Sequence, residues 1–199
     1  MNTYAKNTYR LLAFSILIVL QIQTYAQTYI IDPGHTSVQT KVNRFGVVPV
    51  VGRFNQVSGT IHYDAENFAN TKADVNIKSD SYSANNAGGE AAVKSVAFLD
   101  ASTYPEILFE LSSLTQLDDQ TIAKGFLELH GTRKEIEVPV QIIGPEMDLP
   151  TQKQSIGITG SITIDRTEYG VGKAMQLPTG RVVIANEVQI DFVILGIAE

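Results

Sequence analysis

The stretch QSIGITGSITID at residues 154–165 decides the fold, because its apolar side chains fall on every second position. Gly160 takes one of these apolar positions, and Ser or Thr fills most of the positions between them. Since successive side chains of a strand point to opposite faces, the spacing predicts a strand with one apolar face. At about 3.3 Å per residue it would extend ~40 Å, roughly twice the ordinary length. Its other apolar positions are Ile156, Ile158, Ile162 and Ile164.

Two further stretches show the same alternation. Residues 135–142 read EIEVPVQI, with Pro139 on the polar face, where a proline indicates an edge or a bulge. Residues 181–194 read RVVIANEVQIDFVI, and Asn186 is the one polar residue in the apolar register, so its burial requires hydrogen-bond partners. The apolar positions of the two stretches are Ile136, Val138, Val140, Ile142, Val182, Ile184, Val188, Ile190, Phe192 and Ile194.

The remaining strands have weaker signals, and turn residues at 117–120 and 130–133 separate some of them. Residues 90–99 are rich in Ala and predict one short helix, with residues 85–89 as a loop leading into it. About nine strands result in all. Long antiparallel strands with a continuous apolar face favour a strongly curved sheet or a barrel, with a β-sandwich as the alternative. The weaker strands are predicted at residues 28–32, 36–43, 50–63, 71–78, 106–116 and 121–130.

The N-terminal residues 1–26 are typical of a secretory signal peptide. Lys6 and Arg10 precede an apolar run at residues 11–20, which is shorter than the ~20 residues that a transmembrane helix needs. The small residues of Thr-Tyr-Ala, ending at Ala26, suit a cleavage site. We therefore expect cleavage after Ala26, a periplasmic or secreted protein, and no stable membrane insertion after cleavage.

The mature chain, residues 27–199, has a size that suits one domain. It carries 13 basic and 21 acidic residues, and such a surface repels the phosphates of nucleic acids and disfavours docking of a polybasic surface on membranes. The whole chain contains no Cys, which excludes disulfides, thiol nucleophiles and thiolate metal sites. The stability of the domain must therefore come from packing and from hydrogen bonds within the sheet.

Short motifs along the mature chain carry a resemblance to a known family. Together they resemble, in order, the YceI-like lipid/polyisoprenoid-binding family over nearly the whole mature chain. The resemblance implies an extended antiparallel, lipocalin-like β-barrel with a tunnel for a polyprenyl chain or the isoprenoid tail of a quinone. The motifs lie at residues 29–38 (YIIDPGHTSV), 51–54 (VGRF), 59–61 (GTI), 94–100 (KSVAFLD), 104–109 (YPEILF), 125–134 (GFLELHGTRK) and 164–170 (IDRTEYG).

Some positions depart from the pattern of that family. Arg44 stands where members often carry a His after the second strand, and Thr40 stands where they often carry a Phe. Ahead of the helix, residues 89–90 are Gly-Glu instead of Arg-Asp, and residues 92–93 are Ala-Val instead of His-Leu. The headgroup contacts of the family therefore do not carry over to these positions.

The apolar strand faces are the candidate ligand-binding surface, although the same residues would also suit a close-packed core. An isoprene unit has five carbons, so its burial is worth roughly 3–4 kcal/mol before the costs of binding. An elongated apolar lumen would therefore need few polar residues to bind its ligand. The candidate lumen residues are Val138, Val140, Ile156, Ile158, Ile162, Ile184, Val188, Ile190 and Phe192.

Two polar residues are candidates for contacting the headgroup of a lipid. Arg166 has the geometry to hold a phosphate or a ring carbonyl, and the alternative is a structural salt bridge to Asp165, Glu168 or Asp100. His35 follows Asp32-Pro33-Gly34, where it could instead brace a turn.

Catalytic and metal-binding signals are weak. The chain has three His residues without HExxH spacing, and it has no Gly-x-Ser-x-Gly motif. We therefore expect a non-enzymatic carrier of an isoprenoid lipid, with no metal, no cofactor and no nucleic-acid partner. A homodimer is left open. The alternatives are a small hydrolase or isomerase that uses His35 and Asp32, and a structural module without a ligand.

Overall fold

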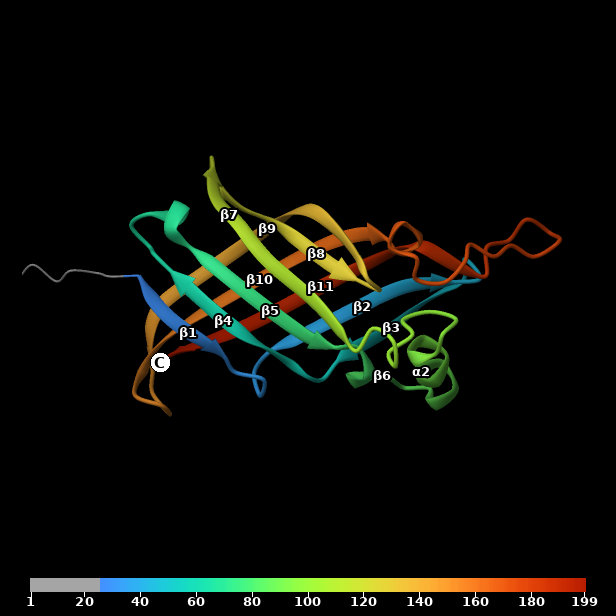
Figure 1. The fold of residues 1–199 in the computed structure, drawn as a ribbon, viewed down its shortest axis with the longest axis horizontal. Helices are drawn as coiled ribbons and strands as arrows, with labels where there is room; N and C mark the ends of the chain where they lie inside the picture. Colours follow the sequence, from blue (N-terminus) through green and yellow to red (C-terminus); the bar gives the residue numbers. More distant parts are fainter. Residues whose placement is uncertain (1–25) are drawn as a thin grey trace, which may run out of the picture.

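The computed structural model describes residues 26–199, which form an elongated barrel of antiparallel strands with one helix at its side (Figure 1). The predicted signal peptide, apart from Ala26, lies outside the described residues. The strands are β1 (Gln27–Ile31), β2 (Ser37–Arg44), β3 (Val48–Phe54), β4 (Val57–Tyr63), β5 (Lys72–Lys78), β6 (Tyr82–Ala84), β7 (Glu106–Leu117), β8 (Gln120–Leu129), β9 (Thr132–Asp148), β10 (Lys153–Asp165) and β11 (Ile184–Ala198). The helix is α2 (Ala87–Lys94), and the 3-10 turns are η1 (Phe68–Asn70), η2 (Ser79–Ser81) and η3 (Arg166–Tyr169).

Eight strands close the barrel in the order β1-β4-β5-β7-β8-β9-β10-β11, and β11 pairs back with β1. The long strand β11 also pairs with β2, from which β3 and β6 extend the sheet. Residues 196–198 of β11 pair with β1, and residues 184–193 pair with β2, so β1 and β2 follow one another along β11. A single closed sheet replaces the two facing sheets of a sandwich, which confirms the predicted all-β antiparallel barrel with one short helix.

The alternation in β10 places one side of the strand inside the barrel. Ile158 pairs with Ile194 and Ile162 pairs with Ile190, so apolar residues of β10 and β11 lie opposite each other on the inner face. Gly160 pairs with Phe192, and a Cβ at Gly160 would lie 2.4 Å from the Phe192 ring. The predicted close approach at this glycine is therefore real, because only a residue without a side chain leaves room for that ring.

Pro139 lies where the pairing of β9 changes partner. Residues 132–140 of β9 pair with β8, and the ladder between β9 and β10 begins at the pair Val140–Gly160 and continues to Asp148. Residues 132–139 therefore do not pair with β10 and form a strand edge on that side. This agrees with the edge predicted at Pro139, because proline has no backbone N–H to donate to a neighbouring strand.

The helix begins and ends earlier than the sequence predicts, at residues 87–94 instead of 90–99. Asn86 Oδ1 accepts hydrogen bonds from the backbone N–H groups of Gly88 and Gly89, at 3.1 and 3.2 Å. The predicted loop at residues 85–89 therefore contains the N-cap and the first turn, because the cap satisfies N–H groups that the helix leaves free. No helix within residues 26–199 has the length and apolar character needed to span a membrane.

Three other details of the strands also differ from expectation. The predicted strand at 50–63 is two strands, β3, which pairs with β2 and β6, and β4, which pairs with β1 and β5. The break lies at Asn55, whose backbone N–H donates to the Ser81 carbonyl at 3.2 Å. Val182 lies outside β11 and is exposed. Asn186 lies at a register shift of β11, and its buried Oδ1 has no hydrogen-bond partner among the described residues. The prediction that a buried Asn186 is satisfied by hydrogen bonds therefore fails for its Oδ1 atom.

Candidate functional site

The barrel encloses an apolar cavity of about 480 Å³, within the range of ~300–1,000 Å³ that is common for small-molecule sites. Side chains from every strand from β2 to β11 line it, because most inward positions of these strands are apolar. Eight of the nine candidate lumen residues lie in this lining, while their contact with a ligand stays a prediction. They are Val138, Val140, Ile158, Ile162, Ile184, Val188, Ile190 and Phe192.

Ile156, the ninth candidate, does not line the cavity but closes one end of the barrel. Its side chain is fully buried, as are those of Tyr29 and Ile61. A Cβ at Gly196 would lie 3.0 Å from Tyr29 Cβ, 3.2 Å from Ile156 Cγ1 and 3.6 Å from Ile61 Cδ1, so these three side chains pack around that glycine. Close packing at this end leaves no room for a ligand.

The other end of the cavity reaches the surface beside α2. Arg44 of β2, Asn86 at the helix N-cap and Ala92 of α2 line the cavity and are also exposed to solvent. The cavity therefore opens between β2 and α2, and the most polar part of its lining lies there.

Some lining residues were missed in the sequence, although a signal for most of them exists. Residues 72–78 and 106–111 contain period-two apolar positions, but β5 is only seven residues long and Leu108 interrupts the polar face of β7. Val93 of α2 also lines the cavity, and no strand pattern could have found it. The missed strand residues include Ala73, Val75, Ile77, Ile107, Phe109 and Leu111.

Arg166 lies at the edge of the cavity and is 4% exposed. Its Nε donates to the Ala185 carbonyl at 3.0 Å and its Nη1 donates to the Val171 carbonyl at 2.6 Å. Its Nη2 donates to the carbonyls of Lys173 and Ile184, both at 3.3 Å. Burial lowers the pKa of Arg166. The guanidinium thus joins residues 171–173 to the start of β11 through backbone carbonyls.

The predicted alternative of a salt bridge from Arg166 to a carboxylate is wrong within the described residues. Glu168 pairs with Lys134, with 2.7 Å between Oε2 and Nζ. Asp165 Oδ1 accepts hydrogen bonds from the backbone and the hydroxyl of Thr167, which keeps the pKa of Asp165 below its usual value. Carbonyl dipoles solvate the buried cation instead, because the turn of η3 directs these carboxylates away from it.

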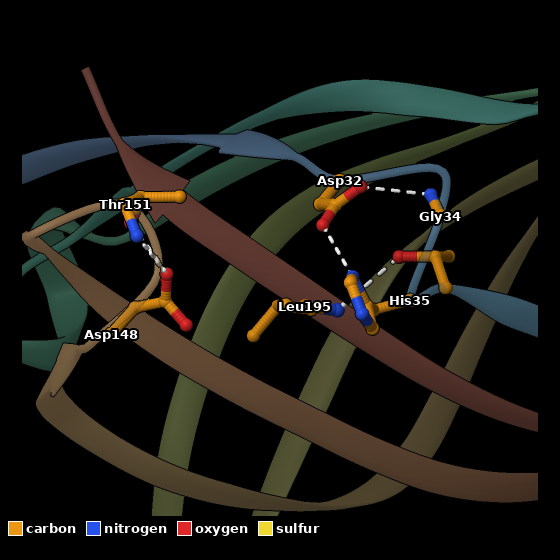
Figure 2. Close-up of polar contacts among 7 residues, drawn as sticks. Asp32, Gly34, His35, Asp148, Thr151 and Leu195 are labelled. Atoms are coloured by element: carbon orange, nitrogen blue, oxygen red, sulfur yellow. Dashed lines mark hydrogen bonds and ion pairs between the residues drawn. The ribbon is translucent and has the colours of Figure 1, made fainter.

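His35 lies on the turn between β1 and β2, outside the cavity lining, and its side chain is 75% exposed. Its Nδ1 lies 2.7 Å from Asp32 Oδ2, and Asp32 Oδ1 accepts a hydrogen bond from the Gly34 N–H at 2.8 Å (Figure 2). These bonds, first the one to His35, lower the pKa of Asp32. Leu195 of β11 holds the turn, since its N–H donates to the Thr36 hydroxyl at 3.2 Å.

We expect His35→Ala to destabilise the protein by about 1 kcal/mol or less, because an exposed pair contributes little. The lowered pKa of Asp32 in the folded state means that its contribution is present above pH ~4 and is lost as the pH falls through the folded pKa. Thermal unfolding of both proteins from neutral to acid pH measures this difference. A loss well above that value at neutral pH, or the loss of an enzymatic turnover, would instead indicate a larger role for His35.

Within residues 26–199, no group of three or more His, Cys, Asp or Glu side chains could hold a metal ion. A second depression, of about 640 Å³, lies where β9 leaves β10 and is bounded by Asp119, Gln141 and Ser161. It is open to solvent and lined by many polar side chains, whereas the internal cavity is enclosed by apolar ones. The internal cavity is therefore the candidate site.

A family model described as the YceI-like domain matches residues 29–195. The chain belongs to the YceI-like family. A UPF0312 protein of Vibrio cholerae serotype O1 is 30% identical over 169 residues, which cover 83% of this chain and 89% of that protein. The crystal structure of BcnA from Burkholderia cenocepacia has the same fold, with a TM-score of 0.73, 23% identity, and coverage of 83% of this chain and 98% of that one.

A second similar structure is that of a polyisoprenoid-binding domain from Saccharophagus degradans, which is implicated in plant cell wall breakdown. Its TM-score is 0.63 at 15% identity, with coverage of 87% of this chain and 99% of that domain. Six positions depart from the pattern that the resemblance implies, and five of them line the cavity, Glu90 being the exception. Thr40, Arg44, Gly89, Ala92 and Val93 all line the cavity.

Proposed function

We propose that the protein is an exported, non-enzymatic carrier for a long-chain isoprenoid lipid. The observation that carries the proposal is the internal cavity, whose lining is apolar from the packed end near Tyr29 to the opening near Arg44. A ligand for this cavity must be long and apolar, because such a lining offers few hydrogen bonds to a polar molecule. The polyisoprenoid-binding domain with the same fold supports this class of ligand.

We place the tail of the lipid inside the barrel and its polar head at the opening. Each buried isoprene unit is worth roughly 3–4 kcal/mol before the costs of binding, so several units suffice for tight binding. Arg166 uses four of its five N–H groups on carbonyls, which leaves one on Nη1 for a headgroup oxygen. His35 is left out of this site because its turn lies outside the cavity.

The two alternatives have less support. A hydrolase or isomerase that uses His35 and Asp32 would act on the exposed turn between β1 and β2, at a place that the cavity does not reach. A structural module without a ligand would keep a large apolar cavity empty. Unfilled volume costs roughly 24 cal/mol per Å³ in series of core mutants, so an occupant is favoured.

The test is mass spectrometry of the protein purified from its native envelope without detergent. We expect organic extracts of the protein to contain one class of isoprenoid lipid, absent from extracts of a similarly purified control protein. The intact mass should correspond to a chain that begins at Gln27, since export would remove residues 1–26. A protein that carries no lipid and binds neither a polyprenol nor an isoprenoid quinone when offered would contradict the carrier. A retained N-terminal segment would contradict cleavage after Ala26.

A further inference from the structure

Two segments far apart in the sequence form one tip of the barrel, which we call the basic tip: residues 44–48 and residues 173–183. Arg44 pairs with Ile184 at the start of β11, and the Phe45 N–H donates to the Val183 carbonyl at 2.9 Å. Residues 173–183 fold back on themselves, with the Val183 N–H bonded to the Met175 carbonyl at 2.9 Å. Figure 1 shows this loop, in red, projecting past the barrel beside the end of β2 and β3.

The basic tip exposes large apolar side chains. Val47 is 75% exposed, although burial of such a side chain is favourable. Exposed apolar side chains that gather at one place on a protein indicate a surface for interaction, whereas single ones need no explanation. The exposed apolar residues of the tip are Val47, Val48, Met175, Leu177 and Val182.

The charge of the basic tip is opposite to that of the rest of the mature protein. Its two segments contain Arg44, Lys173 and Arg181 and no Asp or Glu, whereas the rest of residues 27–199 has 10 basic and 21 acidic residues. The first acid along β11 is Glu187, beyond the tip. The overall charge predicts repulsion from anionic surfaces, but the fold gathers these cations at one end, so attraction there is local.

We propose that the basic tip docks reversibly on an anionic phospholipid surface. A surface that combines apolar side chains with Lys and Arg suits the boundary of such a bilayer. The apolar side chains enter the acyl region, and the cations contact the lipid phosphates. Arg44 belongs both to the tip and to the opening of the cavity. Docking would therefore bring the opening to the membrane, a consequence that rests on the proposed function, although docking itself needs no lipid in the cavity.

A second copy of the chain fits the basic tip less well. In a two-fold dimer the same patch faces itself, so the cations of one copy would meet the identical cations of the other. Three like charges brought together and partly desolvated oppose association, whereas an anionic bilayer neutralises them.

The test is sedimentation of the purified mature protein with phosphatidylcholine vesicles that contain or lack phosphatidylglycerol. We expect binding only to the anionic vesicles, and weaker binding as salt rises from about 0.1 M to about 1 M, where the screening length falls from ~10 Å to ~3 Å. Each cation contributes roughly fivefold to partitioning, so Lys173→Glu combined with Arg181→Glu should reduce it by about 25-fold or more. Val47→Asp should reduce it similarly. None of these side chains lines the cavity.

The opposite end of the barrel supplies matched controls. Leu149, on the turn between β9 and β10, is 75% exposed like Val47, so Leu149→Asp should leave vesicle binding unchanged. Lys72→Glu combined with Lys153→Glu makes the same change in net charge at that end and should have a small effect. Equal losses for both ends, or no binding of the wild type to anionic vesicles, would overturn docking.

Two further readouts separate docking from other outcomes. Sedimentation equilibrium of the same proteins would reveal a dimer, and a wild-type dimer that Val47→Asp dissociates, without vesicle binding, would replace the membrane by a second copy. Lipid content measured on the same samples should be equal in the tip variants and the wild type. A wild type that docks but carries no lipid would contradict the carrier and leave docking standing, and the reverse result would contradict docking alone.

Discussion

Replacing Ile158 by Trp should deplete the bound lipid while the barrel stays folded. Ile158 lies midway along β10, pairs with Ile194 and Ile142, and lines the cavity. The larger indole would enter the space that we assign to the isoprenoid tail. Exclusion of one isoprene unit removes roughly 3–4 kcal/mol, which corresponds to a loss of more than about a hundredfold in affinity.

The matched control is Thr159→Trp on the adjacent residue of the same strand. Thr159 faces outward, between Gln141 of β9 and Val193 of β11, and does not line the internal cavity. Its indole should therefore leave lipid content nearly unchanged. Lipid extracted per mole of protein and the thermal unfolding midpoint are measured for both variants and the wild type.

The same pair of variants distinguishes a lumen from a solid core. If the inner face were close-packed, the indole at 158 would overpack it and cost ~1–3 kcal/mol or more of stability. A strongly destabilised Ile158→Trp protein, beside a wild type that binds no lipid, would contradict the carrier. A folded Ile158→Trp protein with full lipid content would show that the ligand lies elsewhere.

Replacing Arg166 by Met should destabilise the protein by about 3 kcal/mol or more. The substitution removes the hydrogen bonds that Arg166 donates to four backbone carbonyls, and a buried acceptor left without a donor costs ~1–3 kcal/mol. It also frees the segment 171–173, which contains the buried Val171, from its connection to the start of β11. Met fills a similar volume, so the loss reports the polar contacts more than a cavity.

Two other variants make this expectation specific. Arg166→Lys keeps the charge but cannot span carbonyls on both sides, so it should recover only part of the stability. Arg133→Met removes an exposed guanidinium that pairs with Glu110 at 2.7 Å and lies over the Phe126 ring, and it should cost about 1 kcal/mol or less. Denaturant unfolding measures all three. A loss below about 1 kcal/mol for Arg166→Met would show that Arg166 has no structural role and is free for a headgroup.

Period-two alternation in three stretches of sequence predicted the barrel and the part of the cavity lining that β9, β10 and β11 supply. It assigned the inner faces of β9, β10 and β11 correctly, because a strand has one side-chain period whatever its neighbours are. It failed where local geometry follows contacts with distant residues. The break at Asn55 depends on a bond to Ser81, and the helix begins at residue 87 because Asn86 caps it.

The sequence also could not predict where along the barrel a residue lies. Ile156 and Ile158 share a face and a residue type, yet one packs against Tyr29 at the closed end and the other lines the cavity. Arg166 offered several acidic neighbours along the chain, but its partners are carbonyls brought to it by the return of β11. Such partners depend on closure of the sheet, which no local pattern encodes.

The sequence alone thus determined which faces of the strands are apolar and the family to which the chain belongs, because both depend on short-range order along the chain. The tertiary structure alone decided where the cavity ends, where it opens, and which residues gather at the basic tip. The segments that carry Arg44 and Arg181 are distant in sequence and lie at the same end of the barrel only because β2 pairs with β11. Electrostatic and hydrophobic interactions act through space, so a surface that attracts a membrane can form on a chain whose total charge predicts repulsion.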